Sequence, residues 1–136
     1  MFLQQDVLRR GILKVKDKAG NPVIGLIKEL ALYGKRNGYD VVLEGILAER
    51  KYGDMLRGLL SEFDESYVYY MDISFEETLR RHSIRHKNND FGEAEMREWW
   101  QEKDYLGIKG ERTIGEELTE DESTNAILED IQESRS

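Results

Sequence analysis

The chain has 136 residues, a length that suits one compact domain and leaves no room for two. Its formal net charge is -8, so nucleic acid is not expected as a partner. The absence of cysteine excludes a disulfide framework, a thiolate zinc site and a cysteine nucleophile. Met1–Arg10 lacks a signal-peptide pattern and no apolar run is long enough to span a membrane, so we expect a cytoplasmic protein with no membrane partner.

The first forty residues predict a short strand followed by two helices. Residues 1–6 read as the tail of a strand, with Asp6 at the start of the next helix. A polar turn covers Lys14–Gly20. Asn21-Pro22 is typical of a helix start, because an N-cap residue precedes proline at the first helical position. Apolar residues then recur at helical spacing, and Gly38 ends this helix.

An unbroken apolar run, Val41–Leu43, leads into Glu44 and Gly45. Such a run predicts a strand buried on both faces, as inside a parallel α/β sheet. Ligands bind at the carboxyl ends of the strands in these sheets, so Glu44 would face the binding crevice. The alternative is a strand that ends at a turn, with Glu44 in solvent. An apolar stripe from Tyr52 to Phe63 then predicts a helix that contributes to the core.

The second half of the chain repeats this alternation of strands and helices. A second apolar run, Tyr67–Met71, ends at Asp72, and Ser74 with Glu77 forms a capping box for the next helix. Alternation at these lengths implies parallel strands joined by right-handed crossovers. Nearer the C-terminus the sequence predicts a strand, a capping box and a last helix that frays; these are Glu111–Ile114, Thr119 with Glu122, and Gln132–Ser136.

Two acids follow predicted strands and form the first candidate site. Asp6 and Glu44 would both lie at the carboxyl edge of a parallel sheet. Carboxylates there suit a base that takes a proton from a hydroxyl group and a ligand for a phosphate-bound metal ion. For Asp6 alone, the alternative is a plain helix N-cap.

A basic cluster on the helix that begins after Ser74 forms the second candidate site. Arg81 and Arg85 are four residues apart and therefore adjacent on one helix face, without interleaved acids. Arginine side chains in such a pair suit a shared phosphate group, whereas the alternative is a solvated helix face. His82 and His86 also have metal-like spacing, but no third ligand is evident, so we expect no metal site there.

Five stretches of the sequence together carry a resemblance. They are Asp6–Arg10, Val41–Leu47, Tyr69–His82, Phe91–Trp100 and Asp104–Gly107. They resemble small bacterial P-loop kinases, relatives of zeta toxins, chloramphenicol phosphotransferase and gluconate kinase, from Gln5 to about Ile131. The resemblance implies an α/β fold with three layers, a P-loop NTPase-like parallel sheet flanked by helices, in a single domain over residues 1–136.

The resemblance also implies roles for particular residues. In this family the acid after the second strand acts as the substrate base or binds the substrate, and the arginine soon after it contacts the substrate. The implied activity is ATP-dependent phosphorylation of a small hydroxyl-bearing compound, with ATP and Mg²⁺ as cofactors. The residues that match are Asp6 and Glu44 as catalytic acids, Arg9 and Arg10 for the substrate, and Arg81, Arg85 and Arg97 for the nucleotide phosphates, on a lid at about 80–104.

One part of the family pattern is missing from these residues. The phosphate loop, G-x-x-x-x-G-K-[ST], does not occur; Gly34-Lys35 is followed by arginine and has Glu29 where the first glycine belongs. We therefore expect an N-terminally truncated domain with a gap at the central strand of the sheet, and no activity by the isolated chain. A homodimer or a complementing N-terminal fragment would fill the gap.

Two alternatives to a truncated kinase remain. One is a non-catalytic remnant that binds a protein partner or a phosphorylated ligand. The other is a split enzyme whose phosphate loop lies on another chain. The substrate is not readable from the sequence, because members of the family phosphorylate different hydroxyl compounds on one fold.

Overall fold

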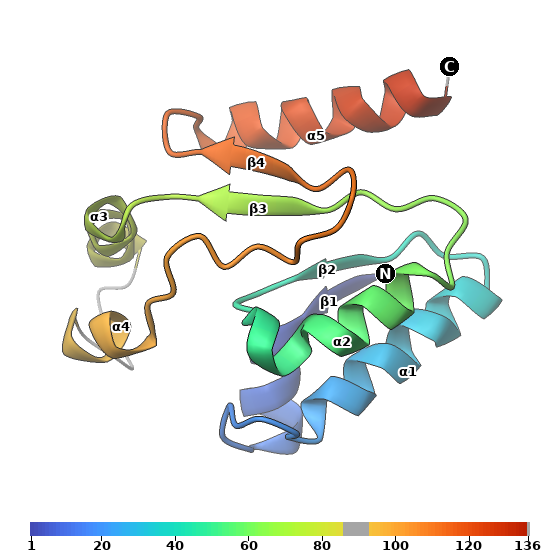
Figure 1. Ribbon diagram of the computed structural model, residues 1–136, viewed down its shortest axis with the longest axis horizontal. Helices are drawn as coiled ribbons and strands as arrows, with labels where there is room; N and C mark the ends of the chain where they lie inside the picture. Colours follow the sequence, from blue (N-terminus) through green and yellow to red (C-terminus); the bar gives the residue numbers. More distant parts are fainter. Residues whose placement is uncertain (86–92, 136) are drawn as a thin grey trace. The chain divides into compact units, whose positions relative to one another are not determined.

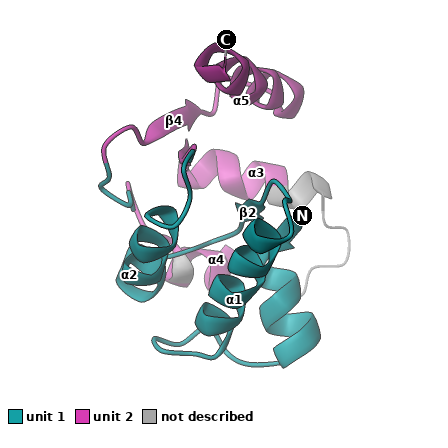
Figure 2. Cartoon of the chain, turned by 90° about the vertical axis from the view of Figure 1, so that its right-hand side faces the viewer, with its two compact units in different colours: residues 1–66, 104–108 teal, residues 67–103, 109–136 magenta. Residues whose placement is uncertain are grey.

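The computed structural model describes residues 1–85 and 93–135 (Figure 1). These residues divide into two compact units, shown in Figure 2. Unit 1 comprises Met1–Ser66 and Asp104–Ile108, and unit 2 comprises Tyr67–Lys103 and Lys109–Ser136. The single domain predicted over residues 1–136 stays a prediction. Across the described ranges, no helix is long and apolar enough to cross a membrane.

Unit 1 is a two-stranded parallel sheet with helices. Strands β1 (Phe2–Gln4) and β2 (Val42–Glu44) pair in parallel, with Leu3 opposite Leu43 and Gln4 opposite Glu44. Between them lie the π-helix η1 (Val7–Leu13) and the helix α1 (Val23–Arg36), and α2 (Glu49–Leu60) follows β2. The strands therefore meet through a helical crossover, as the sequence predicts.

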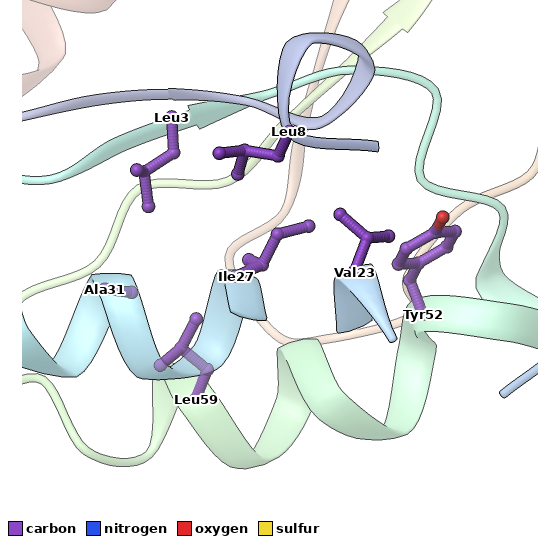
Figure 3. Packing of buried hydrophobic residues seen from close by; sticks show 7 residues of the cluster. All are labelled: Leu3, Leu8, Val23, Ile27, Ala31, Tyr52 and Leu59. Carbon is purple, nitrogen blue, oxygen red and sulfur yellow. The ribbon is translucent and has the colours of Figure 1, made fainter. Parts of the chain in front are cut away.

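The core of unit 1 lies between the sheet and the two long helices. Figure 3 shows Leu3 of β1 and Leu8 of η1 above the facing side chains of α1 and α2. Val23 and Ile27 of α1 and Tyr52 of α2 are completely buried. Burying an aliphatic side chain of this size contributes about 1.5–3 kcal/mol, so this cluster is the main source of stability in the unit. The predicted core role of the Tyr52–Phe63 stripe is confirmed.

Helix α1 begins at Val23, one residue later than predicted, with Pro22 in the N-cap position, and Asn21 still binds the helix start. The side-chain Oδ1 of Asn21 accepts a hydrogen bond of 2.9 Å from the backbone N–H of Val23. Pro22 precedes the helix with φ -67°, the angle that its ring imposes. The helix ends at Arg36, and Gly38 turns the chain toward β2 with φ +76°, a left-handed angle that favours glycine.

The expectation that the Val41–Leu43 strand is buried on both faces is wrong. Val42 is 57% exposed, and its register partner Phe2 on the same face of the sheet is 62% exposed. Leu3, on the opposite face, is buried in the core with α1 and α2. Because successive side chains of a strand point to opposite faces, a core on one side buries alternate residues only. The sheet of unit 1 is thus covered on one face.

Unit 2 also contains a two-stranded parallel sheet. Strands β3 (Tyr69–Asp72) and β4 (Arg112–Gly115) pair with Tyr69 opposite Arg112. The helices are α3 (Phe75–Arg85), α4 (Glu93–Trp99) and α5 (Glu120–Arg135). The strand expected at Glu111–Ile114 is present, one residue later. Helix α5 continues to Arg135, and the fraying expected from Gln132 stays a prediction.

Of the two capping boxes predicted in unit 2, the one at α5 forms completely and the one at α3 forms only in part, so the prediction for α3 is wrong in its reciprocal bond. Thr119 Oγ1 accepts the N–H of Glu122 at 3.1 Å, and the Glu122 carboxylate accepts the N–H of Thr119 at 2.9 Å. These hydrogen bonds lower the pKa of Glu122. At α3, Ser74 Oγ accepts the N–H of Glu77 at 3.2 Å, but the Glu77 carboxylate binds arginines instead of the helix start.

Candidate functional site at the carboxyl edge of β1 and β2

The two predicted acids lie at the same edge of the sheet in unit 1. Glu44 is the last residue of β2 and lies opposite Gln4, the last residue of β1. Asp6 follows Gln4 by two residues. Because the strands are parallel, their carboxyl ends share this edge, which is where open α/β sheets bind ligands.

The carboxylate of Asp6 is paired with the two arginines that follow it. Its Oδ1 lies 3.3 Å from Arg9 Nη2 and 3.5 Å from Arg10 Nε, and the side chain is 62% exposed. Asp6 has helical φ and ψ of -63° and -41° and makes no side-chain capping hydrogen bond to the described residues. The N-cap alternative is therefore wrong. Asp6 instead presents a solvent-accessible carboxylate flanked by two cations.

Arg9 and Arg10 differ in how far they are committed to the fold. The Arg9 side chain is only 16% exposed, and its Nη1 donates to the carbonyl of Val15 at 3.1 Å. Its Nε is buried with no hydrogen-bond partner among the residues described. Arg10 is more exposed and pairs with Asp6 through Nε. Arg9 therefore stabilises the turn after η1, whereas the more exposed Arg10 lies beside Asp6 at the surface.

Glu44 is exposed at the end of β2 and is followed by a glycine that the packing requires. Gly45 has φ +145°, and a Cβ placed there would lie 2.8 Å from the Cβ of Gln5. Only glycine allows the chain to pass this close to Gln5. Within the part of the chain that the structure describes, Glu44 forms no side-chain hydrogen bond or ion pair. Its carboxylate oxygens are available to a hydrated cation or to a hydroxyl group.

Beneath this edge lies a buried polar cluster that the sequence did not reveal. The hydroxyl of Tyr52 accepts a hydrogen bond from Gln5 Nε2 at 2.9 Å and donates to Asp17 Oδ1 at 2.5 Å. Lys51 Nζ donates to the backbone carbonyl of Asp17 at 2.7 Å. Burial, reinforced by the bond to Asp17, raises the pKa of Tyr52. The one sequence signal was a tyrosine in a core stripe, because a buried phenol needs a partner.

Arg81, one of the three predicted phosphate-binding arginines, lies in unit 2 and is already paired. Arg81 Nε lies 3.0 Å from Glu77 Oε1, and its Nη2 donates to the carbonyl of Glu116 at 2.9 Å. Arg80 also binds the Glu77 carboxylate. These contacts lower the pKa of Glu77 to about 2. No acid lies between Arg81 and Arg85, as the sequence shows, but Glu77 lies outside that interval, four residues before Arg81, and neutralises part of its charge.

Of the other two arginines of the predicted lid, the structure describes the side-chain contacts of Arg97 only. Arg97 pairs with Glu93 at 2.9 Å, and its guanidinium lies 4.5 Å from the ring centre of Phe75, a cation–π contact. Arg85 lies in the last turn of α3, and its side chain falls outside the described part of the chain. His86, and residues 86–92 of the lid segment, also fall outside the described residues. Elsewhere in the described chain, no group of three or more His, Cys, Asp or Glu residues could hold a metal ion.

Comparison with known proteins finds no relative of this chain. No family model, no curated protein and no solved structure matches the chain.

Proposed function

We propose that the chain provides the substrate and lid portions of an ATP-dependent phosphotransferase that acts on a small hydroxyl-bearing compound in the cytoplasm. The observation that carries this proposal is the position of Asp6 and Glu44 at one carboxyl edge, with Arg10 beside Asp6. In this proposal Asp6 takes the proton of the substrate hydroxyl, and Arg10 orients the substrate. The proposed fold is a three-layer, P-loop NTPase-like sheet flanked by helices.

The sheet topology supports the gap that this proposal requires. Among the described strands, β2 pairs only with β1 and β3 pairs only with β4. All pairing is parallel, and isolated two-stranded sheets are seldom stable on their own. A further parallel strand would complete such pairs, and a complementing N-terminal fragment or a second copy of the chain would be its source.

Of the two implied cofactors, Mg²⁺ fits the residues present and ATP does not. Glu44 offers carboxylate oxygens, the donors that Mg²⁺ prefers, and has no competing partner among the described residues. The triphosphate of ATP does not fit, because the sequence contains no phosphate loop and Arg81 and Arg97 already bind acids. We therefore propose that the chain by itself does not phosphorylate substrate.

The test is calorimetry with ATP and Mg²⁺ on two proteins, the chain as given and the chain preceded by a strand and a G-x-x-x-x-G-K-[ST] loop. We expect no micromolar binding by the first and restored binding by the second, with a higher melting temperature. Asp6→Asn in the extended protein should lower kcat about 10²- to 10⁴-fold while nucleotide binding persists. Micromolar binding of ATP by the unextended chain would contradict this expectation and would show that other residues hold the phosphates of ATP.

The pairing of the lid arginines favours a second candidate function, a non-catalytic remnant that binds a protein partner or a phosphorylated ligand. In such a protein Arg81 and Arg97 would serve unit 2 itself, as their bonds to Glu77 and Glu93 suggest. The same experiment separates the two functions. An extended protein that is more stable but binds no ATP would support the remnant and contradict the phosphotransferase.

A further inference from the structure

The phenol of Tyr52 joins three segments of unit 1 that are distant in sequence. Its oxygen accepts from Gln5 Nε2 at 2.9 Å and from Asn21 Nδ2 at 3.4 Å, and donates to Asp17 Oδ1 at 2.5 Å. Tyr52 itself is completely buried. One hydroxyl group therefore ties α2 to the residue that follows β1 by one position, to the turn before α1 and to the start of α1.

Of these contacts, the one to Gln5 reaches the candidate site. Gln5 is buried and immediately precedes Asp6. It also packs against Gly45, the residue after Glu44, so closely that a Cβ at position 45 would lie 2.8 Å from the Gln5 Cβ. Gln5 therefore joins the backbone segment that carries Asp6 to the segment that carries Glu44.

We infer that Tyr52 is a positioning residue for Asp6 and Glu44, an inference that rests on the proposed function for the use made of these acids. The phenol holds the Gln5 amide, and Gln5 holds the backbone on either side of it. The backbone that carries the two carboxylates is therefore held in one position at the sheet edge, as a catalytic pair requires. Neither Tyr52 nor Gln5 touches the substrate.

A purely space-filling role for Tyr52 does not account for its surroundings. A phenylalanine would fill the same core volume without a buried hydroxyl group, which is unfavourable unless its hydrogen bonds are made. Here the hydroxyl group makes three hydrogen bonds. One of its partners, Asp17, also forms an ion pair with Lys51, whose Nζ lies 3.5 Å from Asp17 Oδ2. Such a connected cluster holds its members in one arrangement.

The test measures local order in the full chain by ¹⁵N relaxation, with Tyr52→Phe as the main variant. We expect the backbone order parameters at Asp6, Glu44 and Gly45 to fall from about 0.85 toward 0.6, and those in the middle of α1 to stay unchanged. Tyr33→Phe is the matched control, because it removes a hydroxyl from an exposed tyrosine of the same unit. It should change neither region.

A second variant keeps the test decisive if Tyr52→Phe does not fold. Gln5→Met preserves the volume of the side chain and removes only its bond to the phenol, so it should loosen the same three residues. A lower melting temperature with unchanged order at Asp6 and Glu44, or an equal loss of order throughout α1, would overturn the positioning role. Neither measurement needs nucleotide or a phosphate loop, so failure here is distinct from failure of the proposed function.

Discussion

Glu77 shows how one side chain can decide the character of a charged helix. It lies in the first turn of α3, and its carboxylate binds Arg80 three residues later and Arg81 four residues later. The negative charge is also favourable near a helix N-terminus. The group of arginines is therefore partly neutralised within its own helix, and less of its charge is available to an external phosphate.

The lowered pKa of Glu77, about 2, predicts a dependence of stability on pH. Because the folded-state pKa lies below the unfolded value of about 4.3, Glu77 stabilises the fold above that value and loses this effect as pH falls toward 2. Glu77→Gln should lower the urea midpoint at pH 6, and its difference from the wild type should shrink as the pH falls from about 4 toward 2. The measurement is urea unfolding of both proteins from pH 7 to pH 2.

Glu76→Gln is the matched control for this measurement. It removes the same charge from the same helical turn, but Glu76 is exposed and no ion pair to it is found among the described residues. Equal effects of the two substitutions at every pH would show that the ion pairs of Glu77 add nothing beyond its charge near the helix start.

At the residue scale, the sequence predicts helix caps better than it predicts hydrogen bonds between residues that are distant in sequence. Asn21, Ser74 and Thr119 bind the starts of their helices, as the sequence predicts, because a cap bonds within three residues of itself. The partners of Tyr52 come from residues 31 to 47 positions away, which no local pattern encodes. Asp6 and Glu44 were placed at one edge because parallel pairing brings strand ends together. Their catalytic role stays a prediction.

At the scale of elements, α2 receives its N-terminal cap from a remote segment. Ala48 at its N-cap position has no side-chain acceptor, and the N–H of Glu49 instead donates to Asp104 Oδ2 at 3.0 Å. Two residues further along this segment, the carbonyl of Leu106 accepts from Arg57 Nη1 at 2.8 Å. Residues 104–108 are therefore fastened to α2 at both ends of that helix, within unit 1.

Removing this remote cap should destabilise α2. Asp104→Ala is expected to lower the free energy of unfolding by about 0.5–2 kcal/mol, the usual cost of losing a side-chain cap. Asp104→Asn keeps an oxygen acceptor and should lose much less, which separates capping from charge. Urea unfolding followed by circular dichroism measures both variants. If both equal the wild type, solvent satisfies the N–H of Glu49 and the contact does not act as a cap.

Helix α5 is fastened to the sheet of unit 2 through one acidic side chain. Asp130 accepts a hydrogen bond from the Tyr69 hydroxyl at 2.7 Å and pairs with Arg112 at 2.5 Å, so it touches both strands. The bond from Tyr69 lowers the pKa of Asp130, and burial raises the pKa of Tyr69 to about 12. The sequence predicted this helix from its capping box but not its attachment, because Asp130 reads as one more acid on a solvated face.

At the scale of the whole molecule, charge is divided unequally between the two units. By sequence, unit 1 has eleven basic and eleven acidic residues, whereas unit 2 has nine basic and seventeen acidic residues. The formal charge of -8 therefore belongs to unit 2 alone. Acids crowded in this way repel one another and destabilise the compact state, and salt screens the repulsion.

The predicted parallel architecture and its gap also belong to this scale. The order of strands and helices was predictable, because hydrophobic periodicity and capping residues mark each element. The burial of β2 was not predictable. An apolar run such as Val41–Leu43 is buried on both faces only where other elements cover both faces of the sheet, and the run itself does not show this. Phe2 and Val42 remain exposed on one face of the sheet.

The two units should therefore differ in stability. Among the described residues, unit 1 contains eight buried hydrophobic residues, whereas those of unit 2 are Phe75, Met96 and Ile114. Native-state hydrogen exchange should show amides of α1 and β1 protected several-fold more than those of β3 and α5. Raising the ionic strength from about 0.01 M to about 1 M, which shortens the screening length from about 30 Å to about 3 Å, should narrow this difference. Equal protection of the two units at low salt would mean that they unfold as one cooperative body.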